Sequence, residues 1–238
     1  MRTLTPDEAR AFYDRFGSKQ DSQSFYEARA LAQLVANGAF GKARSVFEFG
    51  CGTGRFALDL LEHHLSPNCV YRGIDVSTTM VELARSRLAP FAPRAVVTLA
   101  SAEAGFPLED SSVDRMISTY VLDLLPDAAI RRAVAEARRV LRPDGLLCLV
   151  SITHGSTLPS RVVMGAWQRL FARHPSWVGG CRPMLLAEHL SRKDWVIRFH
   201  ATVVAWGVAS EVLVASPPER AGGTLHSFID PTEVAPRI

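Results

Sequence analysis

The sequence has few cysteines, little net charge and no long apolar run. Its cysteines are far apart and none forms a C-x-x-C pair, so we expect neither disulfides nor a metal site. No apolar stretch approaches the roughly 20 residues of a membrane-spanning helix, and the first residues lack the apolar core of a secretion signal. We therefore expect a cytoplasmic protein. A net charge of +3, without a basic tract, argues against nucleic acid as a partner.

One glycine-rich segment follows an apolar run. In Val46-Phe47-Glu48-Phe49-Gly50-Cys51-Gly52-Thr53-Gly54 three glycines alternate with other residues, and an amphipathic helix is expected directly afterwards. Glycines let the backbone turn sharply and approach a ligand closely, and free N–H groups at a helix start face what binds there. The pattern predicts a cofactor site at the first strand-to-helix turn of an α/β sheet. Arg55 replaces the last glycine of the dinucleotide pattern G-x-G-x-x-G, which argues against NAD.

An acid ends the next expected strand. The run 70–74 leads into Asp75, and Ser77 is a candidate N-cap of the following helix. At the carboxyl end of strand two, beside the glycine turn, the Asp75 carboxylate is able to accept hydrogen bonds from both ribose hydroxyls of a cofactor. Capping of the following helix is the alternative role for this acid.

These segments resemble the class I S-adenosylmethionine (SAM)-dependent methyltransferases. Glu48 and the glycine turn match the family's first motif, 106–114 resembles its "LPFPDNSFD" segment, and 135–147 resembles its "E-x-x-R-V-L-(R/K)-P-G-G-x-L" segment. The resemblance covers roughly residues 45–152. Within the family, the sequence is similar to the enzymes that methylate small molecules, including the quinone-biosynthesis branch. It implies SAM as cofactor and an α/β fold: a Rossmann-like seven-stranded sheet with N-terminal helices and a helical cap insertion after strand five.

The resemblance also implies a set of cofactor-binding residues. Ser101 stands where the family often has an aspartate that meets the adenine amino group, and Glu103 or the backbone of Ala102 is the alternative for that contact. The full set is Glu48, Gly50, Cys51, Gly52, Gly54, Asp75, Val76, Met80, Ser101, Ala102, Glu103, Thr119 and Tyr120.

The alternation of strands and helices predicts the organisation of the chain. Residues 41–152 are expected to form the SAM-binding α/β core, preceded by an N-terminal helical cap over residues 1–40. These first helices either fold over the cofactor cleft, as is common in the family, or dock on the sheet. Residues 153–193 are expected to form the substrate cap, 194–216 a strand hairpin that completes the sheet, and 217–238 a loosely held tail.

Three residues near the ends of strands four and five are candidates for catalysis. Tyr120 and Asp123 follow strand four, and His154 follows strand five. Asp123 falls where related small-molecule enzymes often carry His, so it is a candidate to orient or deprotonate an acceptor; capping a helix is its alternative role. Methyl transfer from SAM needs alignment more than a catalytic side chain, since the cofactor is already a strong electrophile.

The acceptor is expected to be a small metabolite. The run 118–121 lacks the Asn/Asp-Pro-Pro-Tyr/Phe motif of enzymes that methylate adenine or glutamine amides. Trp167, Phe171 and Trp177 in the expected cap suit an apolar or aromatic acceptor, although all three residues are equally suited to a cap core. The leading hypothesis is direct in-line methyl transfer to such a metabolite, and the alternative is a SAM-binding interaction module without catalysis. The sequence leaves the oligomeric state open.

Overall fold

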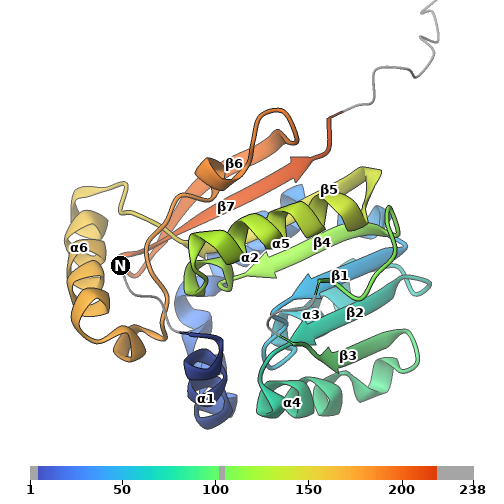
Figure 1. Cartoon of the computed structure of the whole chain (residues 1–238), viewed down its shortest axis with the longest axis horizontal. Coiled ribbons are helices and arrows are strands. Elements are labelled where there is room, and N and C mark those ends of the chain that lie inside the picture. Colours follow the sequence, from blue (N-terminus) through green and yellow to red (C-terminus); the bar gives the residue numbers. More distant parts are fainter. Residues whose placement is uncertain (1–4, 102–104, 219–238) are drawn as a thin grey trace, which may run out of the picture.

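A seven-stranded sheet organises the part of the chain that the structure, a computed structural model, describes, namely residues 5–101 and 105–218 (Figure 1). The strand order is β3-β2-β1-β4-β5-β7-β6, with β7 antiparallel to both neighbours and the other pairs parallel. This is the Rossmann-like order with a closing hairpin that the resemblance implied. The strands are β1 (Ser45–Phe49), β2 (Val70–Asp75), β3 (Ala95–Leu99), β4 (Val113–Thr119), β5 (Leu141–Ile152), β6 (Val196–Ala205) and β7 (Val208–Ser216).

Helices cover both faces of the sheet, because successive side chains of its central strands point to opposite sides and both sides are apolar. Val46 packs in the cluster shared with α2, α3 and α4, whereas its neighbour Phe47 packs in the cluster shared with α5. The α-helices are α1 (Pro6–Phe16), α2 (Ser24–Asn37), α3 (Arg55–Asp59), α4 (Thr78–Leu88), α5 (Asp127–Val140) and α6 (Leu158–Arg173). The shorter helices are η1 (Gly17–Gln23), η2 (Phe40–Lys42), η3 (Leu60–His64), η4 (Ala89–Phe91), η5 (Leu122–Leu124), η6 (Pro175–Val178) and η7 (Leu186–His189).

The helix expected directly after the glycine turn is present. It begins as α3 and continues as a π-turn, η3, to His64, and its residues Ala57 and Leu61 are buried. Strand β4 ends at Thr119, because Tyr120 takes a positive φ of 56° and leaves the extended conformation.

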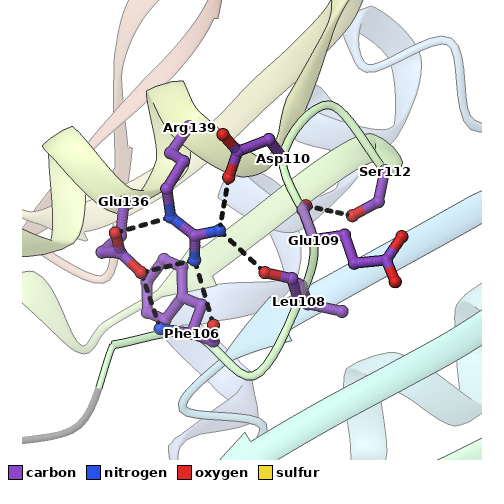
Figure 2. A network of polar contacts seen from close by, with 7 residues as sticks. All are labelled: Phe106, Leu108, Glu109, Asp110, Ser112, Glu136 and Arg139. Atoms are coloured by element: carbon purple, nitrogen blue, oxygen red, sulfur yellow. Dashed lines mark hydrogen bonds and ion pairs between the residues drawn. The ribbon is translucent and has the colours of Figure 1, made fainter.

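The segment between β3 and β4 is held by polar contacts over its described part. The Arg139 guanidinium of α5 contacts the carboxylates of Glu136 and Asp110 and donates to the carbonyls of Leu108 and Phe106 (Figure 2). One planar guanidinium with five donors suits this role, since it satisfies several loop oxygens at once.

The N-terminal helices do two different things. In α2, Ala30 and Leu34 are fully buried and the helix packs against β5, β6 and β7, so it belongs to the core. By contrast, α1 and η1 contact α4 near the carboxyl edge of the sheet. The first 40 residues therefore do not act as one unit. The expected tail falls almost wholly beyond the described residues.

Other expectations concern the whole described chain. All four cysteines are buried and unpaired, so no disulfide joins them. Within residues 5–101 and 105–218, no helix combines the length and apolar character needed to span a membrane.

Candidate functional site

The glycine turn connects β1 to α3, and its glycines have different structural roles. Gly50, Gly52 and Gly54 all have positive φ values, of 77°, 53° and 73°, which L-residues with a Cβ rarely adopt. A Cβ on Gly50 would overlap the Val121 side chain, and one on Gly54 would lie 3.0 Å from the Ala84 Cβ of α4. Gly54 thus permits close packing of two helices, whereas Gly50 permits the close approach of Val121 to the turn.

Two acids flank this turn. The strand register pairs Phe49 with Ile74, which brings the turn beside Asp75. The Asp75 carboxylate accepts hydrogen bonds from the backbone amides of Gly52 and Ser77, each at 2.9 Å. Burial outweighs these bonds and raises the pKa of Asp75. In the adjacent strand, Glu48 is buried and accepts a hydrogen bond from the Tyr71 hydroxyl.

Burial dominates the ionisation of Glu48 as well. Removal from water raises the pKa of its carboxyl group to about 7, and the hydrogen bond from Tyr71 offsets that effect only in part. The side chain of Ser77, in turn, accepts from the Met80 amide and caps α4, as the sequence predicted. Asp75 therefore is not the side-chain cap of that helix.

A small pocket of about 40 Å³ lies against the turn. It brings together six of the residues that the resemblance assigned to the cofactor and adds several that sequence reasoning missed. The expected members are Glu48, Gly50, Cys51, Gly52, Thr119 and Tyr120, and the additional ones are Gln20, Asp21, Glu27, Leu31, Thr53, Arg55 and Phe56. Buried carboxylates beside the backbone of the glycine turn fit a cofactor that carries hydroxyl groups and a positive charge.

The N-terminal segment reaches over this pocket from η1. Asp21 accepts a hydrogen bond from the Thr53 hydroxyl and pairs with the Arg87 guanidinium, both at 2.7 Å. The side chain of Gln20 lies against Gly52, where a Cβ would meet its Oε1 at 3.0 Å. That oxygen is buried and has no hydrogen-bond partner in the part of the chain that the structure describes. We call Asp21, Thr53 and Arg87 the clasp.

Two more contacts join the N-terminal segment to the same edge. Glu27 of α2 forms an ion pair with Arg55, yet burial raises the pKa of Glu27 to about 7. Asp14 of α1 accepts a hydrogen bond from the Ser77 hydroxyl, and this bond lowers the pKa of Asp14. No local sequence pattern predicts these two contacts, because each joins residues that are far apart in the sequence.

Tyr120 faces an aromatic and apolar region beside the glycine turn. Its hydroxyl forms a hydrogen bond of 2.9 Å with the Ser210 hydroxyl, and its ring meets that of Tyr26 edge to face at 5.9 Å. The Tyr13 hydroxyl donates to the Gly179 carbonyl on the other side of this region. The aromatic rings thus come from α1, α2 and the end of β4.

Asp123 is fully buried in η5. Its Oδ2 accepts from the Ile152 amide at 3.0 Å, and its Oδ1 has no hydrogen-bond partner among the described residues. Burial raises the pKa of this carboxyl to about 6. The alternative of a helix cap is wrong, since Pro126 occupies the N-cap of α5 and no side chain caps that end.

The remaining expected residues lie in varied places. His154 is exposed just beyond β5, and Ser101 is exposed after β3. Met80 is buried in α4 and Val76 is half-buried, and neither of them lines the pocket. Gly54 belongs to the glycine turn and Asp75 lies next to it, but neither is part of the pocket lining. Ala102 and Glu103 lie outside the described residues. Within the described chain, no three His, Cys, Asp or Glu side chains are grouped as metal ligands.

Comparisons with known proteins agree on a family. A family model described as "Methyltransferase domain" matches residues 46–145. Among curated proteins, tRNA N(3)-methylcytidine methyltransferase Mettl2 of Drosophila melanogaster is 31% identical over 150 residues, covering 59% of this chain and 46% of that protein. Malonyl-[acyl-carrier protein] O-methyltransferase of Geobacter sulfurreducens is 34% identical over 128 residues, covering 54% and 45%. The matched region thus spans about half the length of these relatives.

Solved structures show the same fold at low sequence identity. The [4+2]-cyclase SpnF superposes with a TM-score of 0.68 at 17% identity, covering 92% of this chain and 98% of that one. Geranyl diphosphate methyltransferase in complex with GPP and sinefungin gives a TM-score of 0.60 at 13% identity, covering 80% and 78%. Likenesses this distant establish the architecture of the chain and leave its reaction to the site.

Proposed function

The chain belongs to the class I SAM-dependent methyltransferase family, and we propose that it transfers the SAM methyl group to a small apolar or aromatic metabolite by direct in-line displacement. One observation carries this proposal. Tyr120 lines the pocket at the glycine turn and also packs against a buried apolar cluster that holds Tyr26, Leu124, Ile152 and Met164. An acceptor bound at that cluster would lie next to the cofactor.

Cofactor binding is assigned to Glu48, Asp75 and the backbone of the glycine turn. When bound, SAM supplies a methyl group on a positively charged sulfur. Each Asp75 oxygen has a lone pair beyond the one used by a backbone amide, so the carboxylate is able to hold the ribose hydroxyls. The faces of Tyr26 and Tyr120 attract a cation by about 0.5–2 kcal/mol each where they approach it.

Asp123 is the base that we assign to an acidic acceptor. With a pKa near 6 it is mostly ionised at neutral pH and has a free oxygen for a proton. A base with a pKa slightly below the working pH combines the required protonation state with useful basicity. Exposed His154 is the second candidate, and Tyr120 is assigned to position the acceptor through its ring.

The test is turnover of SAM to S-adenosylhomocysteine with a panel of phenols, quinols, apolar carboxylic acids and a tRNA mixture. We expect a small aromatic or apolar acceptor to be methylated. The Asp123→Asn variant should lose about 100-fold in kcat while SAM affinity stays within about twofold. Asp127→Asn, at an exposed acid nearby, is the matched control and should keep full activity.

Two outcomes would replace this proposal. Tight SAM binding without product from any acceptor would indicate a cofactor-binding interaction module. Methylation of tRNA alone would indicate a nucleic-acid acceptor, which is what the name of the Drosophila relative describes for that protein.

A further inference from the structure

A second pocket lies at the opposite edge of the sheet, where the parallel strands begin. Its volume is about 260 Å³, far larger than that of the pocket at the glycine turn. Three arginines line it: Arg44 just before β1, Arg72 in β2 and Arg142 in β5. None of them takes part in the site described above, which lies at the carboxyl ends of the same strands.

The arginines of this pocket outnumber the acids. Asp114 is the acid in contact with it, and its carboxylate pairs with the Arg142 guanidinium at 2.8 Å. The other Asp114 oxygen accepts from the backbone amides of Arg44 and Ser45 at 2.7 and 2.9 Å. Neither the Arg44 nor the Arg72 guanidinium forms an ion pair within the described part of the chain. Three guanidinium groups and one carboxylate leave a local surplus of positive charge.

The guanidinium group has a geometry that selects among anions. Its planar fork matches the paired oxygens of a carboxylate or a phosphate, and it stays charged at all physiological pH values. Two guanidinium groups without a partner match a dianion better than a carboxylate with a single charge. A phosphate monoester carries about −1.5 to −2 charges at pH 7.

The remainder of the pocket wall consists of three valines and two serines, Ser45 and Ser112. Val46, Val70 and Val113 contribute to the lining, and Val70 is 40% exposed although it is a strand residue. Drug-sized ligands occupy pockets of roughly 300–1,000 Å³, so this one suits a phosphate group with a few carbon atoms attached. The valines provide a surface for those carbons.

From the charge, the volume and the lining we propose that this pocket binds a small organic phosphate monoester. The phosphate lies between the Arg44 and Arg72 guanidinium groups. Arg142 contributes further positive charge, and its ion pair with Asp114 holds the Arg142 side chain in place. Nucleic acid is the less suitable ligand, because each phosphodiester carries one charge and its backbone needs an extended basic stripe instead of a bounded pocket.

The experiment is a calorimetric titration of the full-length protein with glycerol 3-phosphate. We expect saturable binding that weakens about tenfold to hundredfold in Arg72→Ala and in Arg44→Ala, because each substitution removes a charge-assisted contact. Both side chains are exposed, so both variants should keep the wild-type melting temperature. Arg132→Ala, at an exposed arginine of α5, is the control and should bind within about twofold of wild type.

Every other result either contradicts the proposal or replaces it with a different ligand. Absence of saturation up to millimolar ligand, or unchanged affinity in both arginine variants, would overturn the proposal. Tighter binding of a single-stranded oligonucleotide, with the same arginine dependence, would replace it with a nucleic-acid surface. SAM affinity, measured in parallel, should be unchanged in Arg72→Ala, so this test is separate from that of methyl transfer.

Discussion

The buried acids at the carboxyl edge of the sheet ionise differently from Asp114 at its amino edge. At the carboxyl edge Glu27, Glu48 and Asp123 are buried, and burial raises the pKa values of these groups to about 7, 7 and 6. At the amino edge burial alone would raise the pKa of Asp114, but the Arg44 amide and the Arg142 guanidinium outweigh it. The pKa of Asp114 is therefore lowered.

This difference indicates which ligand charge each edge favours. A nearby cation stabilises the ionised form of buried acids whose pKa values are raised, and SAM brings a sulfonium to that edge. Arginines in excess of acids favour an anion at the other edge. One sheet thus offers two sites of opposite electrostatic character, separated by the length of its strands.

The largest expected effect tests whether burial raises the pKa of Glu48 and so lowers the stability of the protein at high pH. Its pKa is about 7 in the folded chain against 4.5 in the unfolded chain, so stability is fully present below pH 4.5 and falls as pH rises through 7. Glu48→Gln removes this loss. The variant should exceed wild type at pH 8 by up to about 3 kcal/mol in unfolding free energy and match it near pH 4. Urea denaturation at the two pH values measures the difference.

The amino edge supplies the control for that experiment. Because the pKa of Asp114 is lowered, its contribution to stability is present above pH 3.8 and is lost as pH falls. Asp114→Asn should therefore be less stable than wild type at pH 7, the reverse of Glu48→Gln at pH 8. The contrast between the edges fails if both substitutions change stability in the same direction.

A smaller effect concerns cofactor affinity. Asp75→Ala should weaken SAM binding by at least about 1 kcal/mol, the scale of lost ribose hydrogen bonds. Calorimetric titration with SAM measures it, and Asp114→Ala should leave the affinity unchanged because that acid lies at the other edge. Unchanged affinity in Asp75→Ala would remove Asp75 from the cofactor site.

The smallest effect concerns the clasp. Asp21→Ala removes the contacts to Thr53 and Arg87, so η1 should open more often. Amide hydrogen exchange over residues 14–23 should accelerate by about tenfold, on the scale of one lost charge-assisted hydrogen bond. Asp110→Ala breaks an exposed ion pair elsewhere and should leave this exchange unchanged. Equal exchange in wild type and Asp21→Ala would mean that the clasp does not hold the segment.

Local patterns in the sequence determined the central architecture and the cofactor. The alternating glycines predict a tight turn because glycine adopts positive φ values, such as those of Gly50 and Gly52, without a steric cost. Asp75 ends a strand whose parallel neighbour ends at the same edge, so its place beside the turn follows from the order of elements. Such features depend on residues within one strand, turn or helix.

The tertiary structure decided the rest, because those features need side chains from distant segments to converge. Gln20 and Asp21 reach the glycine turn only through the packing of η1 against α4, and Asp123 acquires its raised pKa only when the chain buries it. The pocket formed by Arg44, Arg72 and Arg142 likewise arises from strands brought together by the sheet. The spacing of these residues in the sequence does not predict that they meet. Long-range packing creates both the burial of Asp123 and the excess of positive charge in the arginine pocket.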